Sequence, residues 1–219
     1  MTSSFWNLYR PGVVYRVEKQ RRFAENRLDD ERTLITRAQR GDAEAFASLV
    51  RQYEQIAFRA AFLILRDQHE AADATQDAFV RAYRAIGAFE LDRRFCPWLL
   101  RIVTNQALNR IQATHRRTRA TERYAQQLSS NQFDSALDHT LASNEQNARL
   151  QQAVRQLSVD EQALIALRYF LELPEVEVAE ALEIPLGTVK SRLHRTLAQL
   201  RAIIQRDFPD LKELTTFDS

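Results

Sequence analysis

The sequence predicts an all-α fold of two small helical domains, and three features support this. Glycine and proline, which form most turns in β structure, number only four and five among 219 residues. Good helix formers such as Ala, Leu, Arg, Gln and Glu dominate the composition. Apolar residues recur every three to four positions in two long stretches, the spacing of one buried helix face. A polar stretch without this period separates them, so we expect a flexible linker between two domains.

These features divide the chain into five segments. We expect an N-terminal extension at 1–30, a first domain at 31–115, a linker at 116–144, a second domain at 145–206 and a tail at 207–219. The extension has an aromatic first half and a charged second half. Its role stays open at this stage, because it could pack on the body, bind a partner or remain without fixed structure.

Helix boundaries in the first domain follow from capping and breaking residues. A short apolar stripe ends at Gly41, and Asp42 is a good N-cap for the next helix. A third helix is expected at about 70–86, ending at Gly87. Pro97 suits the first turn of a fourth helix. These four helices can share one core.

The second domain ends in a pair of helices joined by a short turn. Ser158 and Glu161 form a capping box that starts one of its helices. Pro174 is expected at the first position of another, and a basic helix runs from about 188 to 204. A helix-turn-helix has this layout, in which the first helix supports a second that enters the DNA major groove.

Charge is distributed unevenly although the formal net charge is only +2. The segment from Arg101 to Arg123 contains six arginines and one acid, which gives a local charge of +5. The segment from Thr188 to Arg206 contains five basic residues and no acid, which gives another +5. Asp67, Glu70, Asp73 and Asp77 give −4 over a stretch without a basic residue. Such patches can bind a polyanion and a protein, or they can be solvated helix faces, and charge alone does not decide.

The sequence carries none of the residue patterns that mark an enzyme or a metalloprotein. Cys96 is the only cysteine, and the four histidines lack metal-ligand spacing, so we expect no metal and no cofactor. No paired carboxylates, nucleophile–base set or phosphate-binding glycine loop is present, so no catalytic residue is expected. No apolar run reaches the roughly 20 residues that span a bilayer, and the start lacks a secretory signal pattern, which indicates the cytoplasm.

The last helix has one apolar face and one face suited to DNA. Its apolar stripe consists of Val189, Leu193, Leu197 and Leu200. The opposite face carries Lys190, Ser191, Arg192, His194 and Arg195. Arginine and lysine can pair with guanine O6 and N7, and Thr188 at the helix start can meet a phosphate. On spacing alone, the alternative is a helical hairpin with a solvated basic face.

Four segments in order resemble a known family. GTVKSRLHR after VAEALEIP resembles region 4, the C-terminal promoter-reading domain of the extracytoplasmic-function (group 4) sigma factors of bacterial RNA polymerase, in the sigma-70 family. RAQRGDAEAFASLVRQYE, DATQDAFVRAYRAI and WLLRIVTNQALNRI resemble their region 2. The resemblance covers about 32–115 and 145–205. One such segment is weak evidence, whereas four in order are specific.

The resemblance implies a function and assigns residues to three surfaces. A sigma factor directs promoter-specific initiation, and the group implies a stress or envelope-response regulon. The expected polymerase-binding residues, which meet the clamp coiled coil, are Asp73, Gln76, Asp77 and Arg81. The expected −10 DNA residues are Phe89, Arg93, Arg94, Arg101, Asn105, Asn109 and Arg110, with Phe89 and Asn105 lining a pocket for a flipped base. The expected −35 DNA residues are Thr188, Lys190, Ser191, Arg192, His194 and Arg195.

The resemblance also implies partners, and the chain departs from the family pattern in places. The expected partners are the RNA polymerase core, through its clamp coiled coil and flap, promoter DNA, and an anti-sigma factor. The N-terminal extension is a candidate to contact that inhibitor or region 2. Glu183 replaces a glycine common in the turn, and Leu173-Pro174 replaces a usual serine cap. We expect the turn not to require a positive φ at Glu183.

Two rival functions remain open from the sequence. A LuxR-like transcriptional activator shares the helix-turn-helix but needs a sensor or receiver domain upstream, and residues 34–114 show no α/β alternation. A helical adaptor without DNA function is the second rival, and the basic last helix argues against it.

Overall fold

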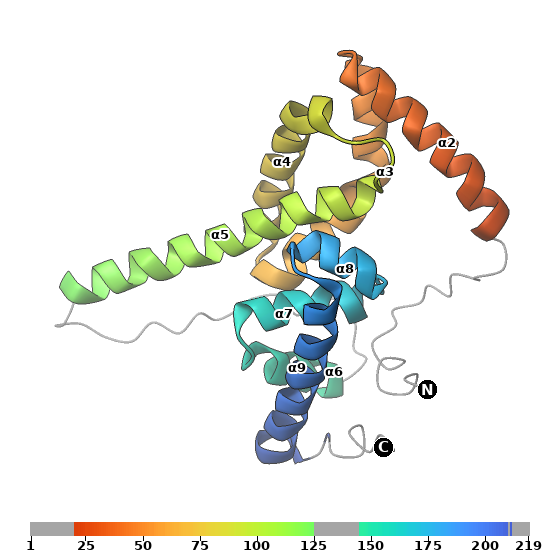
Figure 1. Ribbon diagram of the computed structural model, residues 1–219. Coiled ribbons are helices and arrows are strands. Elements are labelled where there is room, and N and C mark those ends of the chain that lie inside the picture. The colour runs from red at the N-terminus through yellow and green to blue at the C-terminus, as the bar shows by residue number, and fades with distance from the viewer. Residues whose placement is uncertain (1–19, 125–144, 210, 212–219) are drawn as a thin grey trace.

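The computed structural model describes the backbone of residues 20–124, 145–209 and 211, and the side chains of 30–114, 149–209 and 211. Every regular element in these ranges is helical, which confirms the predicted fold class. Figure 1 shows the helices as two groups, α2 to α5 above and α6 to α9 below. Residues 1–19 of the predicted N-terminal extension, 125–144 of the predicted linker, and 210 and 212–219 of the tail lie outside the described residues.

The first domain contains α2 (Gln20–Gln39), α3 (Ala43–Leu65), α4 (Gln68–Ala85), a 3-10 turn η2 (Ile86–Ala88) and α5 (Phe95–Tyr124). Asp42 caps α3 as predicted, because its side chain accepts hydrogen bonds from the backbone N–H groups of Glu44 and Ala45. The bond from Ala45 and the Arg37 guanidinium lower the pKa of the Asp42 carboxyl. Gly41 precedes this cap with φ of 90°, a conformation that glycine adopts without strain.

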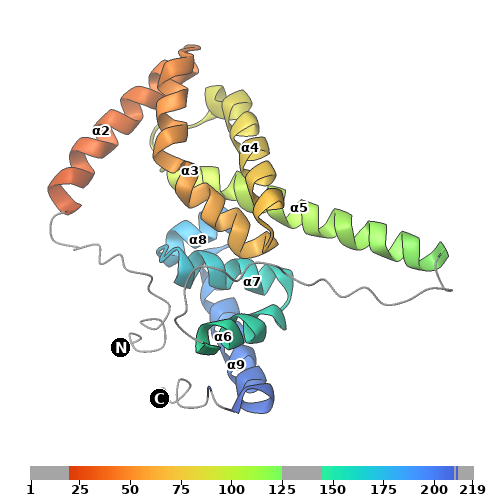
Figure 2. The same ribbon diagram turned by 180° about the vertical axis from the view of Figure 1, so that it is seen from behind.

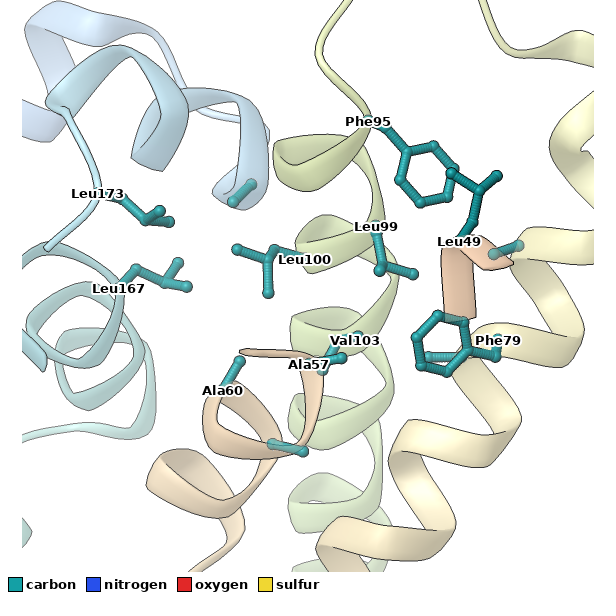
Figure 3. Packing of buried hydrophobic residues seen from close by; sticks show 14 of the residues in the cluster. Leu49, Ala57, Ala60, Phe79, Phe95, Leu99, Leu100, Val103, Leu167 and Leu173 are labelled. Carbon is teal, nitrogen blue, oxygen red and sulfur yellow. The ribbon is translucent and has the colours of Figure 1, made fainter. Parts of the chain in front are cut away.

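The core of the first domain lies where α3, α4 and α5 pack together. Leu49, Phe79, Leu99 and Val103 are buried there and converge in Figure 3. Gln39 at the end of α2 donates from its amide to the backbone carbonyls of Ile86 and Phe89. This pair of bonds fixes the start of the loop that joins α4 to α5.

Two helices are longer than the sequence predicted. The last helix of the first domain continues to Tyr124, so residues 116–124, expected as part of the linker, are helical. Both views show this end of α5 projecting beyond the other helices (Figures 1 and 2). Helix α2 begins at Gln20, inside the predicted extension. Both segments lack glycine and proline, so nothing in them stops a helix.

The second domain contains α6 (Glu145–Arg155), α7 (Val159–Ile165), a π-helical turn η3 (Ala166–Phe170), α8 (Glu175–Leu182) and α9 (Leu186–Asp207). The predicted capping box is present, since the Ser158 hydroxyl accepts from the Glu161 N–H and the Glu161 carboxylate accepts from the Ser158 N–H. Its own core gathers side chains from α6, α7 and α9: Leu150, Val154, Ile165, Leu200 and Ile204.

The two domains pack against each other, which the sequence pattern did not predict. Helix α5 contacts α7 and α8, and α3 contacts α7 and η3. Buried side chains form one continuous cluster from the first domain to Leu167 and Leu173 of the second. Figure 3 shows Leu99 directed into the first-domain core, while Leu100, from the next position of α5, is directed toward Leu167 and Leu173.

Candidate nucleic-acid interfaces

The turn between α8 and α9 sets the position of the last helix. Glu183 ends α8 in the left-handed region at φ of 53°, so the expectation that this turn needs no positive φ is wrong. The conformation costs a residue with a Cβ about 1–2 kcal/mol. Pro185 is the N-cap of α9, and the Thr188 N–H donates to its carbonyl at 2.8 Å. Pro174 is likewise the N-cap of α8, so the prediction that it is the first helical residue is wrong.

Helix α9 has the two faces that the sequence predicted. Val189, Leu193 and Leu200 are buried, and Leu197 is partly buried. The residues predicted for the −35 element lie on the other face, where Thr188 is half-buried and the rest are exposed: Lys190, Ser191, Arg192, His194 and Arg195. The N-terminal half of α9 therefore presents cationic side chains to solvent beside a helix N-terminus, which suits a phosphate backbone.

The loop before α5 places its aromatic residue inside the protein. Phe89 is only 5% exposed and packs edge-on against Trp98, with ring centroids 4.9 Å apart, and against Phe95. Phe89 therefore belongs to the core in this structure, and its role in a pocket for a flipped base stays a prediction. Trp98 is partly buried and packs against this core through Phe89 and Phe95.

Three of the predicted −10 residues pair with acids of α8. Arg94 forms an ion pair with Glu177, and Arg101 forms one with Glu183 at 2.6 Å. The Asn105 amide donates to the other Glu183 carboxylate oxygen at 3.5 Å. The structure therefore brings the basic surface of α5 against an acidic end of the second domain.

Arg110 joins two sites that the sequence treated separately. Its guanidinium pairs with Asp77 at 2.8 Å and Glu70 at 2.7 Å, with Asp73 at 3.9 Å. The hydrogen bonds to Asp77 and Glu70 raise the pKa of Arg110. Arg110, predicted to contact the −10 element, therefore neutralises part of the acidic face of α4 that is predicted to bind polymerase. Of the other predicted −10 residues, Arg93 and Asn109 are exposed.

The predicted polymerase-binding residues lie together on the outer face of α4. Asp73, Gln76, Asp77 and Arg81 are all exposed. Beside them a groove between α3 and α4 carries exposed apolar side chains that sequence reasoning missed: Val80 is 45% exposed and Tyr83 44%. Their spacing from Gln76, four and seven residues, puts all three on one face of the helix and was the signal that could have found them.

An all-helical protein whose helix-turn-helix exposes a cationic recognition helix belongs to the class of DNA-binding transcription proteins. The family model "Sigma-70, region 4" matches residues 147–200, and "Sigma-70 region 2" matches 49–117. SigW, an ECF RNA polymerase sigma factor of Bacillus subtilis (strain 168), is 34% identical over 177 residues, covering 76% of this chain and 92% of SigW. The chain belongs to the extracytoplasmic-function group of the sigma-70 family, and it is a sigma factor that directs promoter-specific transcription initiation.

Other relatives agree with this assignment. RNA polymerase sigma-H factor of Pseudomonas aeruginosa (strain PAO1) is 32% identical over 183 residues, covering 81% of this chain and 95% of that one. ECF RNA polymerase sigma-E factor of Escherichia coli (strain K12) is 33% identical over 175 residues, covering 75% of this chain and 89% of that one.

Solved structures share the fold. CnrH, in complex with the cytosolic domain of CnrY, superposes with a TM-score of 0.58 at 25% identity, covering 81% of this chain and 99% of CnrH. The sigma factor RpoE from Bartonella quintana, in complex with the anti-sigma factor NepR, gives a TM-score of 0.55 at 18% identity, covering 74% and 98%. Among the described helices of this chain, none combines the length and the apolarity needed to cross a membrane.

Proposed function

We propose that the two domains divide promoter recognition between them. The second domain, 145–206, reads the −35 element through α9, and the first domain, 31–115, reads the −10 element and holds RNA polymerase. The observation that carries this proposal is the exposed cationic face of α9, which has its apolar stripe buried and its helix start open. Base-edge readout requires this combination of an anchored helix and free donor side chains.

We assign −10 contacts to polar and cationic side chains of the first domain, all of them exposed except the half-buried Arg101. Arg93, Arg94, Arg101, Asn105 and Asn109 lie along the loop before α5 and its first half. Cationic and amide donors along one track suit a DNA strand, whose phosphates supply most of the binding energy. We leave Phe89 and Arg110 out, because the first is in the core and the second is held by Asp77 and Glu70.

We assign RNA polymerase core binding to the outer face of α4, with the clamp coiled coil and flap as the elements that the resemblance implies. Asp73, Gln76, Asp77 and Arg81 supply polar contacts, and the neighbouring Val80 and Tyr83 supply apolar area. Exposed apolar groups rimmed by charge are typical of a protein interface. On the basis of the family we also propose an anti-sigma partner, a stress or envelope-response regulon and a cytoplasmic location, and we assign no chemical step to this chain.

Runoff transcription tests the proposal. The purified chain with RNA polymerase core should give specific transcripts from a subset of genomic promoters, and core alone should not. A LuxR-like activator, which the sequence left open, shares only the helix-turn-helix, whereas this chain also matches sigma-70 region 2. A chain that gave no promoter-specific product with the core enzyme would contradict the proposal.

A further inference from the structure

Part of the surface that we assign to the −10 element is paired with acidic side chains of the chain's own second domain. Arg94, Arg101 and Asn105 are three of the five residues in that assignment, and each meets a carboxylate of α8 or its C-cap. Both acids belong to one short element, with Glu177 in the first turn of α8 and Glu183 as its C-cap. A row of carboxylates along a cationic track supplies the same charge that DNA phosphates supply.

The contact beneath these ion pairs resembles a protein core. Leu100, Leu167 and Val178 are fully buried, and Leu173 is 6% exposed. Ala57 and Ala60 of α3 are also fully buried and belong to the same cluster. Separation of the domains would expose this apolar surface to water, which opposes opening unless another surface replaces the contact.

Glu183 is a left-handed helix C-cap, and the Ile184 N–H donates to the Ala179 carbonyl across it. A glycine would adopt φ of 53° without strain, and a carboxylate at a helix C-terminus is repelled by the helix dipole. Two local effects therefore disfavour glutamate at this position. The Arg101 guanidinium at 2.6 Å and the Asn105 amide offset part of this cost, and these partners lie in the other domain.

The packing of the two domains leaves the proposed −35 surface of α9 open but not the proposed −10 surface of α5. The exposed face of α9, with Lys190 and Arg192, points to solvent while α8 occupies the α5 surface.

We propose that α8 is an internal ligand of the −10 surface, in which Glu177 and Glu183 take the place of DNA phosphates at Arg94, Arg101 and Asn105. In the free protein the second domain covers this surface. Promoter DNA in the holoenzyme must displace α8 to reach it. The proposal rests on the −10 assignment made above and adds to it a competitor within the same chain.

The single cysteine reports whether the domains are closed. Burial, and next the nearby carboxylates of Glu177 and Glu31, raise the pKa of the Cys96 thiol to about 12. A thiol reacts with alkylating reagents as the thiolate, so the closed protein should react slowly. Removal of Glu177 from its place beside Cys96, by opening or by substitution, should increase the rate.

The test compares three full-length chains. The parent carries Lys190→Glu and Arg192→Glu, so that α9 does not contribute to binding. The double variant adds Glu177→Gln and Glu183→Gln, which removes both internal carboxylates. The control adds Glu180→Gln to the parent instead, which removes a carboxylate of α8 that pairs with no α5 residue among those described. The probe is a short fluorescent single-stranded DNA of mixed sequence, and iodoacetamide alkylation of Cys96 is followed in parallel. Circular dichroism checks that each variant is folded.

The double glutamine variant should bind the single strand about fivefold more tightly, which is the effect expected from loss of two surface ion pairs. Cys96 alkylation should also be faster, and the Glu180→Gln chain should match its parent in both measurements. Exchange of charges, Arg101→Glu with Glu183→Arg, should restore slow alkylation relative to Arg101→Glu alone. Equal affinity and equal alkylation in the double variant and its parent would overturn the proposal, and so would the same gain from Glu180→Gln.

One further variant separates this inference from the proposed function. Arg101→Gln in the holoenzyme should reduce runoff transcription, because Arg101 contacts the −10 strand once α8 has moved. If Arg101→Gln transcribes fully, the −10 assignment fails, and the idea of a competitor for DNA fails with it. If Arg101→Gln is impaired while the double variant binds and alkylates like its parent, only the internal ligand is disproved.

Discussion

The N-terminal half of α9 and the first half of α5 both carry the cationic side chains that DNA recognition needs, but their surroundings differ. On α9, Lys190 and Arg192 are exposed, and no carboxylate pairs with them in the part of the chain that the structure describes. On α5, Arg101 is paired with Glu183 of the other domain. A basic patch in the sequence is therefore not yet a free surface, because the fold decides which cations remain available to a partner.

The two sides of α5 differ in what they stabilise, and paired substitutions should separate them. Leu99→Ala should lower the free energy of unfolding of the first domain by about 2–5 kcal/mol, because it leaves a cavity among Leu49, Phe79 and Val103. Urea titration followed by circular dichroism measures the change.

Leu100→Ala is the matched control, since this side chain faces the second domain. It should weaken the contact between domains and separate their unfolding into two transitions, with less effect on the first domain itself. If Leu99→Ala and Leu100→Ala gave identical unfolding curves, the division of α5 into two sides would be contradicted.

The exposed face of α9 should carry most of the discrimination between promoters. Lys190→Glu with Arg192→Glu should reduce runoff transcription at least about 100-fold, because each base or phosphate contact contributes about 1–3 kcal/mol. Stability should not change, as both side chains are exposed.

Arg201→Glu serves as the control for this effect. Arg201 is exposed on the same helix but lies outside the set of side chains assigned to base contacts. It should cost far less activity. Equal losses from the two variants would mean that α9 contributes only diffuse positive charge.

The smallest expected effect concerns the turn between α8 and α9. Glu183→Gly and Glu183→Gln both remove the ion pair with Arg101, but only glycine relieves the left-handed conformation. Glu183→Gly should therefore be about 1 kcal/mol more stable than Glu183→Gln in thermal unfolding. A glutamine variant as stable as the glycine variant would show that φ of 53° carries no strain.

Local sequence signals predicted much of the fold. The Asp42 cap, the capping box at Ser158 and the apolar stripe of α9 each depend on residues within a few positions of one another, and all are present. The same reasoning placed the −35 candidates on one exposed face. Helix ends without a stop signal were less certain, so α5 was predicted to end before Tyr124.

The pairing between distant residues could not be predicted in this way. Asn105 and Glu183 are 78 positions apart, and Arg110 and Asp77 are 33 apart. The sequence shows that each of these side chains is charged or polar, but only the packing of α5 against α4 and α8 decides which of them meet. Phe89 is similar, because an aromatic residue in a loop can stack on a base or complete a core, and Phe95 and Trp98 complete it here.

The separation of the two domains tests the central claim most directly. Spin labels can be attached at Arg84→Cys on α4 and Gln199→Cys on α9, both exposed, in a Cys96→Ala background. Double electron–electron resonance should give one narrow distance distribution in the free chain and a different distance after addition of RNA polymerase core and promoter DNA. The same distance in both states, or a broad spread of distances in the free chain, would contradict an α8 that occupies the −10 surface until promoter binding.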